Sequence, residues 1–435
     1  MATGVSKTKW NGDGVPTVGN ASAPNGVDAV ITYEGKRAES EILATKAASP
    51  RLLWESSQQA ENRLYYGDNL PVLAYLLDDR SVAGRIRLVY IDPPFSTRSV
   101  FQSRSQIDAY QDLLVGSRYL EFLRERLVLL RELLAKDGAI YVHLDDNIAF
   151  YVKVIMDEVF GRRNFRNWIT RKKCNPKNYT RRTYGNVSDY ILFYTKSDTY
   201  AWNRPYDEWR PERAEREYSY VDTKTGRRYK KVPIHAPGVR HGKTGNSWRG
   251  MMPPPGKHWQ YTPSGLDEMD ARGEIYWSSN GNPRRKVFLD DSAGVPLQDI
   301  WLDFRDAHNQ MIRITGYPTE KNPELLRRIV QASSNPGDLV LDCFSGSGTS
   351  LAVASELGRR WIGIDSSRVA IETTLRRFAR GLERMGDFVA KKRAPQQGEV
   401  SSIMLPAIKD FSLYATESCD GELGEAVAAL DNWTT

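Results

Sequence analysis

The segment 338–365 constrains the fold of this 435-residue chain more than any other stretch. It reads as a buried strand at 338–344, a helix at 347–357 and a second strand at 360–365, and the junction of the first strand with the helix contains two glycines, Gly346 and Gly348. Strands that alternate with helices in this way build parallel sheets covered by helices. The pattern predicts an α/β fold with a ligand site at the carboxyl ends of its strands.

The same alternation occurs earlier in the chain. An apolar strand at 85–91 precedes a helix at 117–135, in which leucines at 120, 123, 127, 130 and 134 fall on one face. A strand at 139–144 and a helix at 147–160 follow, and helices at 323–333 and 366–382 belong to the second half. The simplest architecture is one Rossmann-like sheet made from residues 46–160 and 313–395, with residues 161–312 inserted between them.

The glycine loop at 342–349 favours an adenosine-containing ligand. Gly346 and Gly348 allow a tight turn, and Asp365 at the end of the next strand can accept hydrogen bonds from ribose hydroxyls. The loop has no P-loop pattern for ATP phosphates and no third glycine in dinucleotide register. The carboxylate of Asp342 suits a positively charged methionyl-sulfonium cofactor better than a pyrophosphate.

The turn Asp92-Pro93-Pro94-Phe95 has the chemistry of a site for an amino group. Proline lacks a backbone N–H, so the turn mostly offers acceptors, namely the Asp92 carboxylate and the Pro93 carbonyl. These match the two hydrogens of an exocyclic base amine, and Phe95 supplies a flat face for stacking. Accepting both hydrogens localises the nitrogen lone pair, and Asp92 can take the proton released after attack.

Each motif alone also has a simpler explanation, because Asp-Pro is common in turns and glycines are common between a strand and a helix. Two other functional classes stay open at this level. A nicotinamide-dependent oxidoreductase would use the glycine loop and Asp365, but the missing third glycine argues against it. A DNA-binding protein without catalysis would not need Asp92, Gly346 and Gly348, which are all present.

Positive charge is concentrated in the insertion. The chain has a formal net charge of +7, but residues 161–260 hold 23 Lys or Arg against 8 Asp or Glu, a charge of +15. The same window has 16 of the 46 aromatic residues. Basic side chains interleaved with Trp and Tyr suit a phosphate backbone with unstacked bases, although a solvated basic face would have the same composition.

Together the two motifs resemble those of the bacterial site-specific DNA amino-methyltransferases, in particular the permuted β class, in which the catalytic turn precedes the cofactor loop. The stretches 66–70 (YGDNL) and 316–323 (GYPTEKNP) resemble further elements of that class. The stretches 156–161 and 295–301 resemble the modification subunits of type III restriction systems. The resemblance covers residues 62–385 and implies a methyltransferase sheet with permuted motif order.

The resemblance also implies roles for individual residues. Asp92, Pro93, Pro94 and Phe95 would hold a flipped-out target base, and residues 161–312 would form the target-recognition region. S-adenosyl-L-methionine would be held by Asp342, Phe344, Gly346, Ser347, Gly348, Thr349 and Asp365, with Asp68, Thr319 and Lys321 as further candidates. In this family Asp at the first position of the turn goes mostly with adenine N6 and Ser mostly with cytosine N4, so Asp92 favours adenine.

Two positions depart from the family pattern. Phe95 stands where Tyr is more common, which keeps the stacking face but removes a hydroxyl. Glu320 stands where Gln is often found, which changes the polarity near the expected cofactor site.

The expected substrate is double-stranded DNA, whose target base must leave the helix to reach the turn. An RNA substrate stays open. Many relatives dimerise, so a homodimer is one expectation. Restriction would need a partner subunit, because the sequence has no helicase or nuclease motif. We expect a cytoplasmic protein without membrane segments, since no long apolar run occurs and Cys174, Cys343 and Cys419 are too scattered for a disulfide framework.

The remaining segments carry weaker signals. Residues 1–45 and 396–435 are predicted to be tails with little regular structure. The five histidines lack the spacing of a metal site, and no metal is expected. His143 lies beside Asp145 and Asp146 at the end of a strand, and we expect it to have a structural or solvated role rather than a catalytic or metal-binding one.

Overall fold

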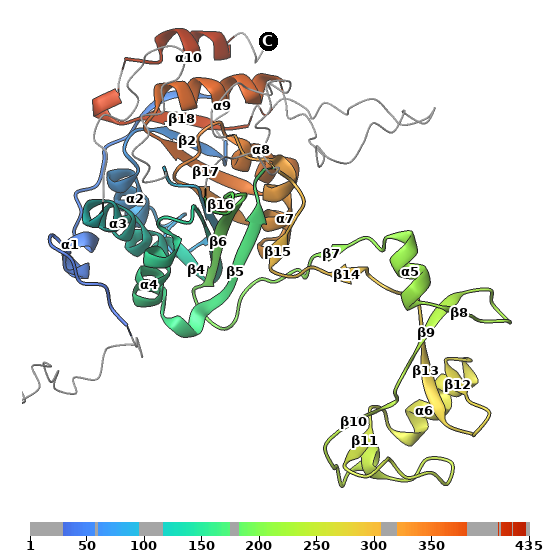
Figure 1. Cartoon of the computed structure of the whole chain (residues 1–435). Helices are drawn as coiled ribbons and strands as arrows, with labels where there is room; N and C mark the ends of the chain where they lie inside the picture. The colour runs from blue at the N-terminus through green and yellow to red at the C-terminus, as the bar shows by residue number, and fades with distance from the viewer. Residues whose placement is uncertain are drawn as a thin grey trace, which may run out of the picture. The chain divides into compact units, whose positions relative to one another are not determined.

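The computed structural model describes residues 29–56, 60–94, 116–174, 182–305, 320–380, 408, 410–419 and 421–431. The chain divides into two compact units (Figure 1). Unit 1 contains the residues up to Asn203 and those from Gln298 onward, whereas unit 2 is the segment Arg204–Leu297.

A ten-stranded sheet forms the centre of unit 1, in the order β1-β18-β2-β17-β16-β3-β4-β6-β5-β15. The strands are β1 (Arg51–Glu55), β2 (Arg63–Tyr66), β3 (Ile86–Ile91), β4 (Leu134–Leu144), β5 (Phe165–Lys172), β6 (Ser188–Thr195), β15 (Ile300–Trp301), β16 (Leu339–Asp342), β17 (Arg360–Asp365) and β18 (Ser412–Ala415).

The two sequence halves meet where β3 and β16 pair in parallel, with Leu88 beside Val340 and Val89 beside Leu341. All strands from β18 to β4 run parallel, and β6 is antiparallel to both of its neighbours. These strands are apolar and buried on both faces, as parallel sheets covered by helices require. The predicted α/β fold, built from two separated halves, is confirmed.

Helices cover both faces of the sheet (Figure 1). On one face α2 (Asn69–Asp78), α3 (Ser117–Leu133) and α4 (Ala149–Phe160) pack side by side, with α1 (Glu39–Leu43) against α3. On the other lie α7 (Pro323–Ser333), α8 (Thr349–Glu356) and α9 (Arg368–Arg380). The predicted leucine face of α3 is buried, and Leu123, Leu127 and Leu130 have no exposed surface. The helix ends earlier than predicted, because Leu134 already starts β4.

Both segments predicted to be tails contribute to unit 1. The described part of residues 1–45 starts at residue 29 and includes α1, whose Ile42 is completely buried. Residues Ser412–Ala415 form β18 between β1 and β2, and α10 (Gly424–Asp431) follows. These elements are short and pack on partners far away in the sequence, so local periodicity does not indicate them.

Unit 2 is smaller than the predicted insertion, because β5, β6 and β15 belong to the sheet of unit 1. It contains a four-stranded antiparallel sheet and a core around Trp248, Trp259 and Leu266. Its elements are β7 (Tyr206–Asp207), α5 (Pro211–Glu217), β8 (Tyr220–Val221), β9 (Arg228–Val232), β10 (His235–Pro237), β11 (Lys257–Trp259), α6 (Pro263–Ala271), β12 (Ile275–Trp277), β13 (Pro283–Phe288) and β14 (Val295–Pro296).

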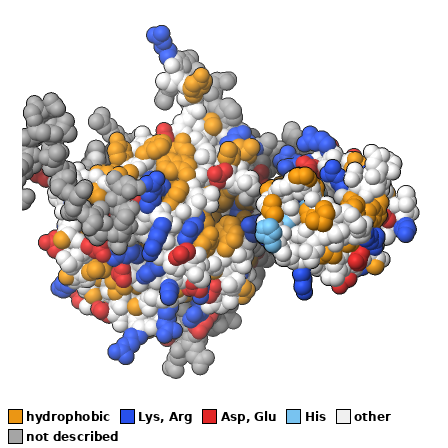
Figure 2. All heavy atoms as spheres, turned by 90° about the horizontal axis from the view of Figure 1, so that it is seen from below, with side chains coloured by type: hydrophobic (Ala, Val, Ile, Leu, Met, Phe, Trp, Pro, Cys, Tyr) orange, Lys and Arg blue, Asp and Glu red, His pale blue; other side chains and the backbone are white. Residues whose placement is uncertain are grey.

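The positive charge of the insertion is shared between the units. Unit 2 has 17 Lys or Arg against 12 Asp or Glu, a charge of +5, whereas residues 161–203 of unit 1 have 10 against 2, a charge of +8. Figure 2 shows Lys and Arg side chains interspersed with acidic and hydrophobic ones. Some aromatic rings of unit 2 contact its own cations, since Lys231 Nζ lies 3.6 Å from the ring centroid of Tyr220 and 3.5 Å from that of Tyr276.

Within the described ranges, no helix combines the length and the apolar character needed to cross a membrane.

Candidate active site

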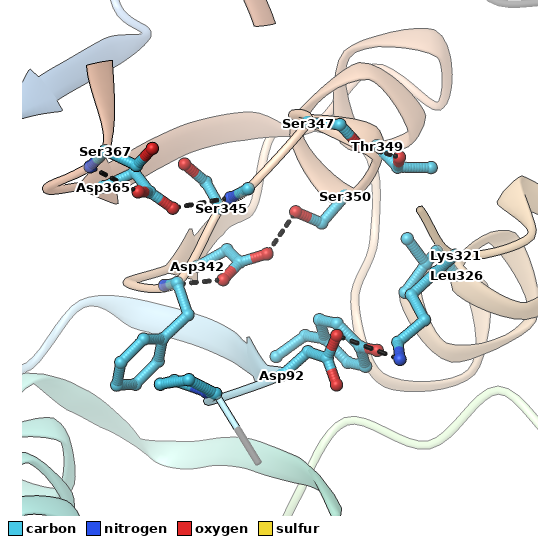
Figure 3. A pocket seen from close by; sticks show the side chains of 14 residues that line it. Asp92, Lys321, Leu326, Asp342, Ser345, Ser347, Thr349, Ser350, Asp365 and Ser367 are labelled. Carbon is cyan, nitrogen blue, oxygen red and sulfur yellow. Dashed lines mark hydrogen bonds and ion pairs between the residues drawn. The ribbon is translucent and has the colours of Figure 1, made fainter. Parts of the chain in front are cut away.

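The carboxyl ends of β3 and β16 lie next to each other, and residues from both strand ends line one cavity (Figure 3). The lining residues are Tyr90, Asp92, Pro94, Lys321, Leu326, Asp342, Phe344, Ser345, Gly346, Ser347, Thr349, Ser350, Asp365 and Ser367. The Asp92 turn and the glycine loop therefore share a cavity, although they come from opposite halves of the sequence.

The two carboxylate oxygens of Asp92 have different surroundings. Oδ2 lies 3.0 Å from Lys321 Nζ, and both side chains are largely buried. Oδ1 is buried and has no hydrogen-bond partner among the described residues. A buried carboxylate oxygen without a donor is costly, so Asp92 is arranged to accept a hydrogen bond from a ligand.

The glycine loop takes a conformation that other residues rarely adopt. Gly346 and Gly348 have φ angles of 51° and 71°. A Cβ atom on Gly348 would lie 2.6 Å from Thr374 Cγ2, so space as well as backbone angle requires glycine there. The Gly346 N–H donates to Asp365 Oδ2 at 2.8 Å, and the Ser367 N–H donates to Asp365 Oδ1 at 2.8 Å. Asp365 thus holds the loop that leads into α8.

Burial gives the cavity two carboxyl groups with raised pKa values. Burial raises the pKa of Asp342 to about 7, against the opposing effects of hydrogen bonds from Ser350 Oγ and the Phe344 N–H. Nearby Asp92 and Asp365 raise it further. Burial also raises the pKa of Asp365. A cationic ligand would favour the ionised form of both groups, so the cavity suits a sulfonium or an ammonium group.

The polar groups present also fit the rest of such a ligand. Ser345 Oγ lines the cavity, is buried and has no hydrogen-bond partner in the described part of the chain. Ser347 and Thr349 line it beside the start of α8. Together with Asp342 and Asp365, these side chains supply donors and acceptors for an amino acid moiety and a ribose.

The predicted site residues are distributed unevenly. Asp68 does not line the cavity: it caps α2 by accepting from the Leu70 N–H at 3.0 Å and lies 3.0 Å from Arg126 Nη2. Pro93 and Gly348 are not among the lining residues either, although their neighbours are. Phe95 and Thr319 lie outside the described residues, so their predicted roles stay predictions.

Glu320, the departure from the family pattern, has a partner in the structure. It forms an ion pair with Arg377 of α9, and both side chains are at most 9% exposed. Arg377 Nε also donates to the Ser347 carbonyl at 2.6 Å. The pair therefore links the segment before α7 to the glycine loop, which explains how an acid is accommodated there.

The structure adds lining residues that sequence reasoning missed. Tyr90 precedes Asp92 by two positions, and the period-two alternation of a strand places both side chains on the same side. Ser350 lies in the first turn of α8 and reaches back to Asp342. Ser367 follows Asp365 by two positions and donates its backbone N–H to the Asp365 carboxylate. The alternation signal for Tyr90 was present in the sequence, whereas the serines carry no pattern of their own.

Comparison with known proteins identifies the family. A family model described as DNA methylase matches residues 86–376. Over 435 residues the chain is 47% identical to the type II methyltransferase M.EcaI of Enterobacter cloacae, which covers 96% of this chain and 94% of that protein. The chain belongs to this DNA methylase family. The resemblance to β-class amino-methyltransferases, inferred from the two motifs, is confirmed.

This methylase is also 26% identical to the StyLTI Mod subunit of a type III restriction-modification enzyme from Salmonella typhimurium. That match covers 67% of this chain and 49% of the Mod subunit, so the methylase spans about half of the length of that relative. Among solved structures, the M1.HpyAVI–SAM complex aligns with a TM-score of 0.40 and 16% identity, over 72% of this chain and 98% of that one.

Proposed function

We propose that this DNA methyltransferase methylates the N6 amino group of an adenine that is flipped out of double-stranded DNA. The observation that carries the proposal is the buried Asp92 Oδ1, an acceptor without a described partner in a cavity shared with the glycine loop. An exocyclic amine supplies the missing donor. The base must leave the stack, because a base that is paired inside the duplex cannot bring its amine into the cavity.

The chain's own residues account for binding and for the proton. Asp92 and the Pro93 carbonyl accept the two amine hydrogens, which favours a tetrahedral nitrogen with a localised lone pair. S-adenosyl-L-methionine supplies an electrophilic methyl group, and Asp342, Ser345, Ser347, Thr349 and Asp365 are the residues that hold it. Asp92 then takes the proton that the amine loses. Asp92 and the glycine loop line the same cavity, so the proton acceptor and the proposed cofactor site lie together.

Asp at the first position of the catalytic turn supports adenine, as the family resemblance implies. Cytosine N4 is the alternative, because both amines present two hydrogens beside a ring nitrogen and satisfy Asp92 equally well. Neither guanine O6 nor thymine O4 does so, since a carbonyl would face acceptor oxygens and be repelled.

Sequence recognition is proposed to lie in the insertion, 161–312, supported by its charge of +15 over residues 161–260. Unit 2 falls entirely within this segment. The type III relatives favour a restriction partner for the methylase, and a homodimer is the proposed assembly. Mass measurement of the purified protein by light scattering, alone and with duplex DNA, tests the assembly.

The experiment is methyl transfer from tritium-labelled S-adenosylmethionine to unmethylated chromosomal DNA and, side by side, to total RNA. Nucleoside analysis identifies the product, and long-read sequencing identifies the surrounding motif. We expect N6-methyladenine in DNA within one sequence motif. Asp92→Ala should lose activity while calorimetry still detects cofactor binding. N4-methylcytosine would overturn the choice of adenine, and labelled RNA alone would overturn the choice of DNA. An active Asp92→Ala variant would overturn the role of Asp92.

A further inference from the structure

A buried chain of polar side chains runs from the cavity across four neighbouring strands of unit 1. Tyr90 of β3 lines the cavity, and its hydroxyl lies 2.9 Å from Nδ1 of His143 in β4. His143 Nε2 lies 2.9 Å from Asp189 Oδ2 in β6. The three residues are at most 2% exposed. Polar groups buried this deeply keep the same hydrogen-bond partners, because water does not reach them. Each hydrogen therefore has a defined direction.

The far end of the chain is closed by an arginine. Arg171 of β5 is fully buried, its Nη1 lies 3.0 Å from Asp189 Oδ2, and its Nη2 donates to the Phe304 carbonyl at 2.8 Å. Burial opposes ionisation of Asp189, but its contacts with His143 and Arg171 outweigh this effect and hold the pKa of Asp189 well below its usual value. Asp189 is therefore a carboxylate, which only accepts hydrogen bonds.

The carboxylate sets the tautomer of His143. Asp189 Oδ2 lies 2.9 Å from Nε2 but out of line for a regular hydrogen bond. A nitrogen lone pair this close to a carboxylate oxygen would still be repelled, so Nε2 carries a hydrogen. Arg171 already balances the charge of Asp189, so a second buried cation on the imidazole would lack a counter-charge. His143 is then neutral, and its Nδ1 is an acceptor. The hydroxyl of Tyr90 must donate to it.

We propose that His143 and Asp189 are positioning residues for methyl transfer: they turn the Tyr90 hydrogen away from the cavity, so that Tyr90 presents only oxygen lone pairs beside Asp92. This rests on the proposed role of the cavity. An amine that attacks a methyl group develops positive charge, and its N–H groups need acceptors. A hydroxyl hydrogen pointing into the cavity would oppose both the amine and a sulfonium.

The first test measures the tautomer without any activity. Nitrogen spectra of the full-length protein labelled with ¹⁵N-histidine contain five rings, and the set missing from His143→Gln belongs to His143. We expect a protonated Nε2 and an unprotonated Nδ1. A protonated Nδ1, whether in the other neutral tautomer or in a doubly protonated ring, would overturn the proposal.

The second test uses single-turnover methyl transfer to unmethylated chromosomal DNA. Tyr90→Phe removes the oxygen, and His143→Phe removes the acceptor, so that the Tyr90 hydroxyl can turn its hydrogen into the cavity. Each should slow transfer by about tenfold or more, with cofactor affinity unchanged within about twofold. The double variant should be no slower than Tyr90→Phe alone, because the acceptor has no effect without the hydroxyl.

Additive losses in the double variant would indicate a general structural effect and overturn the proposal, as would full activity of Tyr90→Phe. The matched control is Tyr141→Phe, which removes another buried hydroxyl of the same sheet, bonded to Ser333 Oγ at 2.8 Å, and should keep the rate. Asp92→Ala is measured in parallel. An active Asp92→Ala refutes the proposed function of the cavity, whereas its loss together with a normal Tyr90→Phe refutes only the role of Tyr90.

Discussion

Lys321 Nζ lies 3.0 Å from Asp92 Oδ2, so the segment before α7 contacts the Asp92 turn directly. The two side chains are 10% and 16% exposed. From the sequence, Lys321 is a candidate for the cofactor, and that role stays a prediction. What the structure adds is a cation on one oxygen of Asp92, which leaves the other oxygen for the proposed amine. Lys321 therefore orients the carboxylate as well as neutralising it.

Replacing this lysine should destabilise the protein and misplace Asp92. Lys321→Met leaves Asp92 Oδ2 buried without its cation, and we expect the free energy of unfolding to fall by about 1–3 kcal/mol. Methyl transfer should fall as well. Urea denaturation followed by circular dichroism measures the first effect and labelled methyl transfer the second.

The double variant Asp92→Asn/Lys321→Met separates the ion pair from other effects of Lys321. Removing both charges should recover most of the lost stability, because the uncompensated carboxylate is gone. Activity should stay lost, since Asp92 is the proposed proton acceptor. Equal losses of stability in the single and double variants would show that the pair is not the cause.

Cofactor binding should depend on pH through Asp342. The pKa of Asp342 is raised to about 7, and a cationic ligand binds its ionised form better. The dissociation constant should therefore rise by up to about tenfold for each pH unit below 7 and level off above it. Calorimetric titration with S-adenosylmethionine between pH 5.5 and pH 8.5 measures this (about three units around the pKa).

Asp342→Asn provides the control, because it should bind more weakly at every pH and lose this dependence. The free energy of unfolding should depend on pH in the opposite direction to cofactor affinity. The folded protein holds a proton on Asp342 that the unfolded chain releases near pH 3.8, so this stabilising contribution is present below pH 3.8 and is lost as the pH rises to about 7. If Asp342→Asn kept the same pH dependence of cofactor binding, a group other than Asp342 would be responsible for it.

Gly348 should tolerate no side chain. In Gly348→Ala the new Cβ would meet Thr374 Cγ2 and Oγ1 at 2.6 and 2.7 Å and would keep a φ of 71°. Thr374 Oγ1 donates to the Gly346 carbonyl at 3.0 Å, so displacing Thr374 would disturb the glycine loop. We expect a loss of more than about 1 kcal/mol in stability and a cofactor affinity lowered by about tenfold or more.

Gly337→Ala is the matched control for backbone strain. Gly337 also has a positive φ, 84°, but a Cβ there would meet nothing within 4 Å. It should cost only about 1 kcal/mol and leave cofactor affinity unchanged. Similar affinities for the two variants, measured by calorimetry, would contradict a specific role for the space around Gly348.

The sequence was sufficient for the elements whose physics is local. Strand β16, the turn at Gly346 and Gly348 and the acid at Asp365 follow from apolar runs, glycines and strand ends, and all three meet at the cavity. The contacts that local patterns do not encode were missed. Examples are the Lys321–Asp92 ion pair and the burial of His143 between Tyr90 and Asp189, because both depend on the order of strands in the sheet.

Phe411 offers a test of how firmly the C-terminal segment belongs to unit 1. It is completely buried, and its ring centroid lies 4.9 Å from that of Trp54 and 5.3 Å from that of Phe378. Phe411→Ala should therefore lower the free energy of unfolding by about 3–5 kcal/mol, measured by urea denaturation. Phe150→Ala is the control, because Phe150 is 62% exposed and should cost less than about 1 kcal/mol. Similar costs for the two would mean that the segment around β18 does not complete the core, and the sequence-based prediction of a tail at 396–435 would stand.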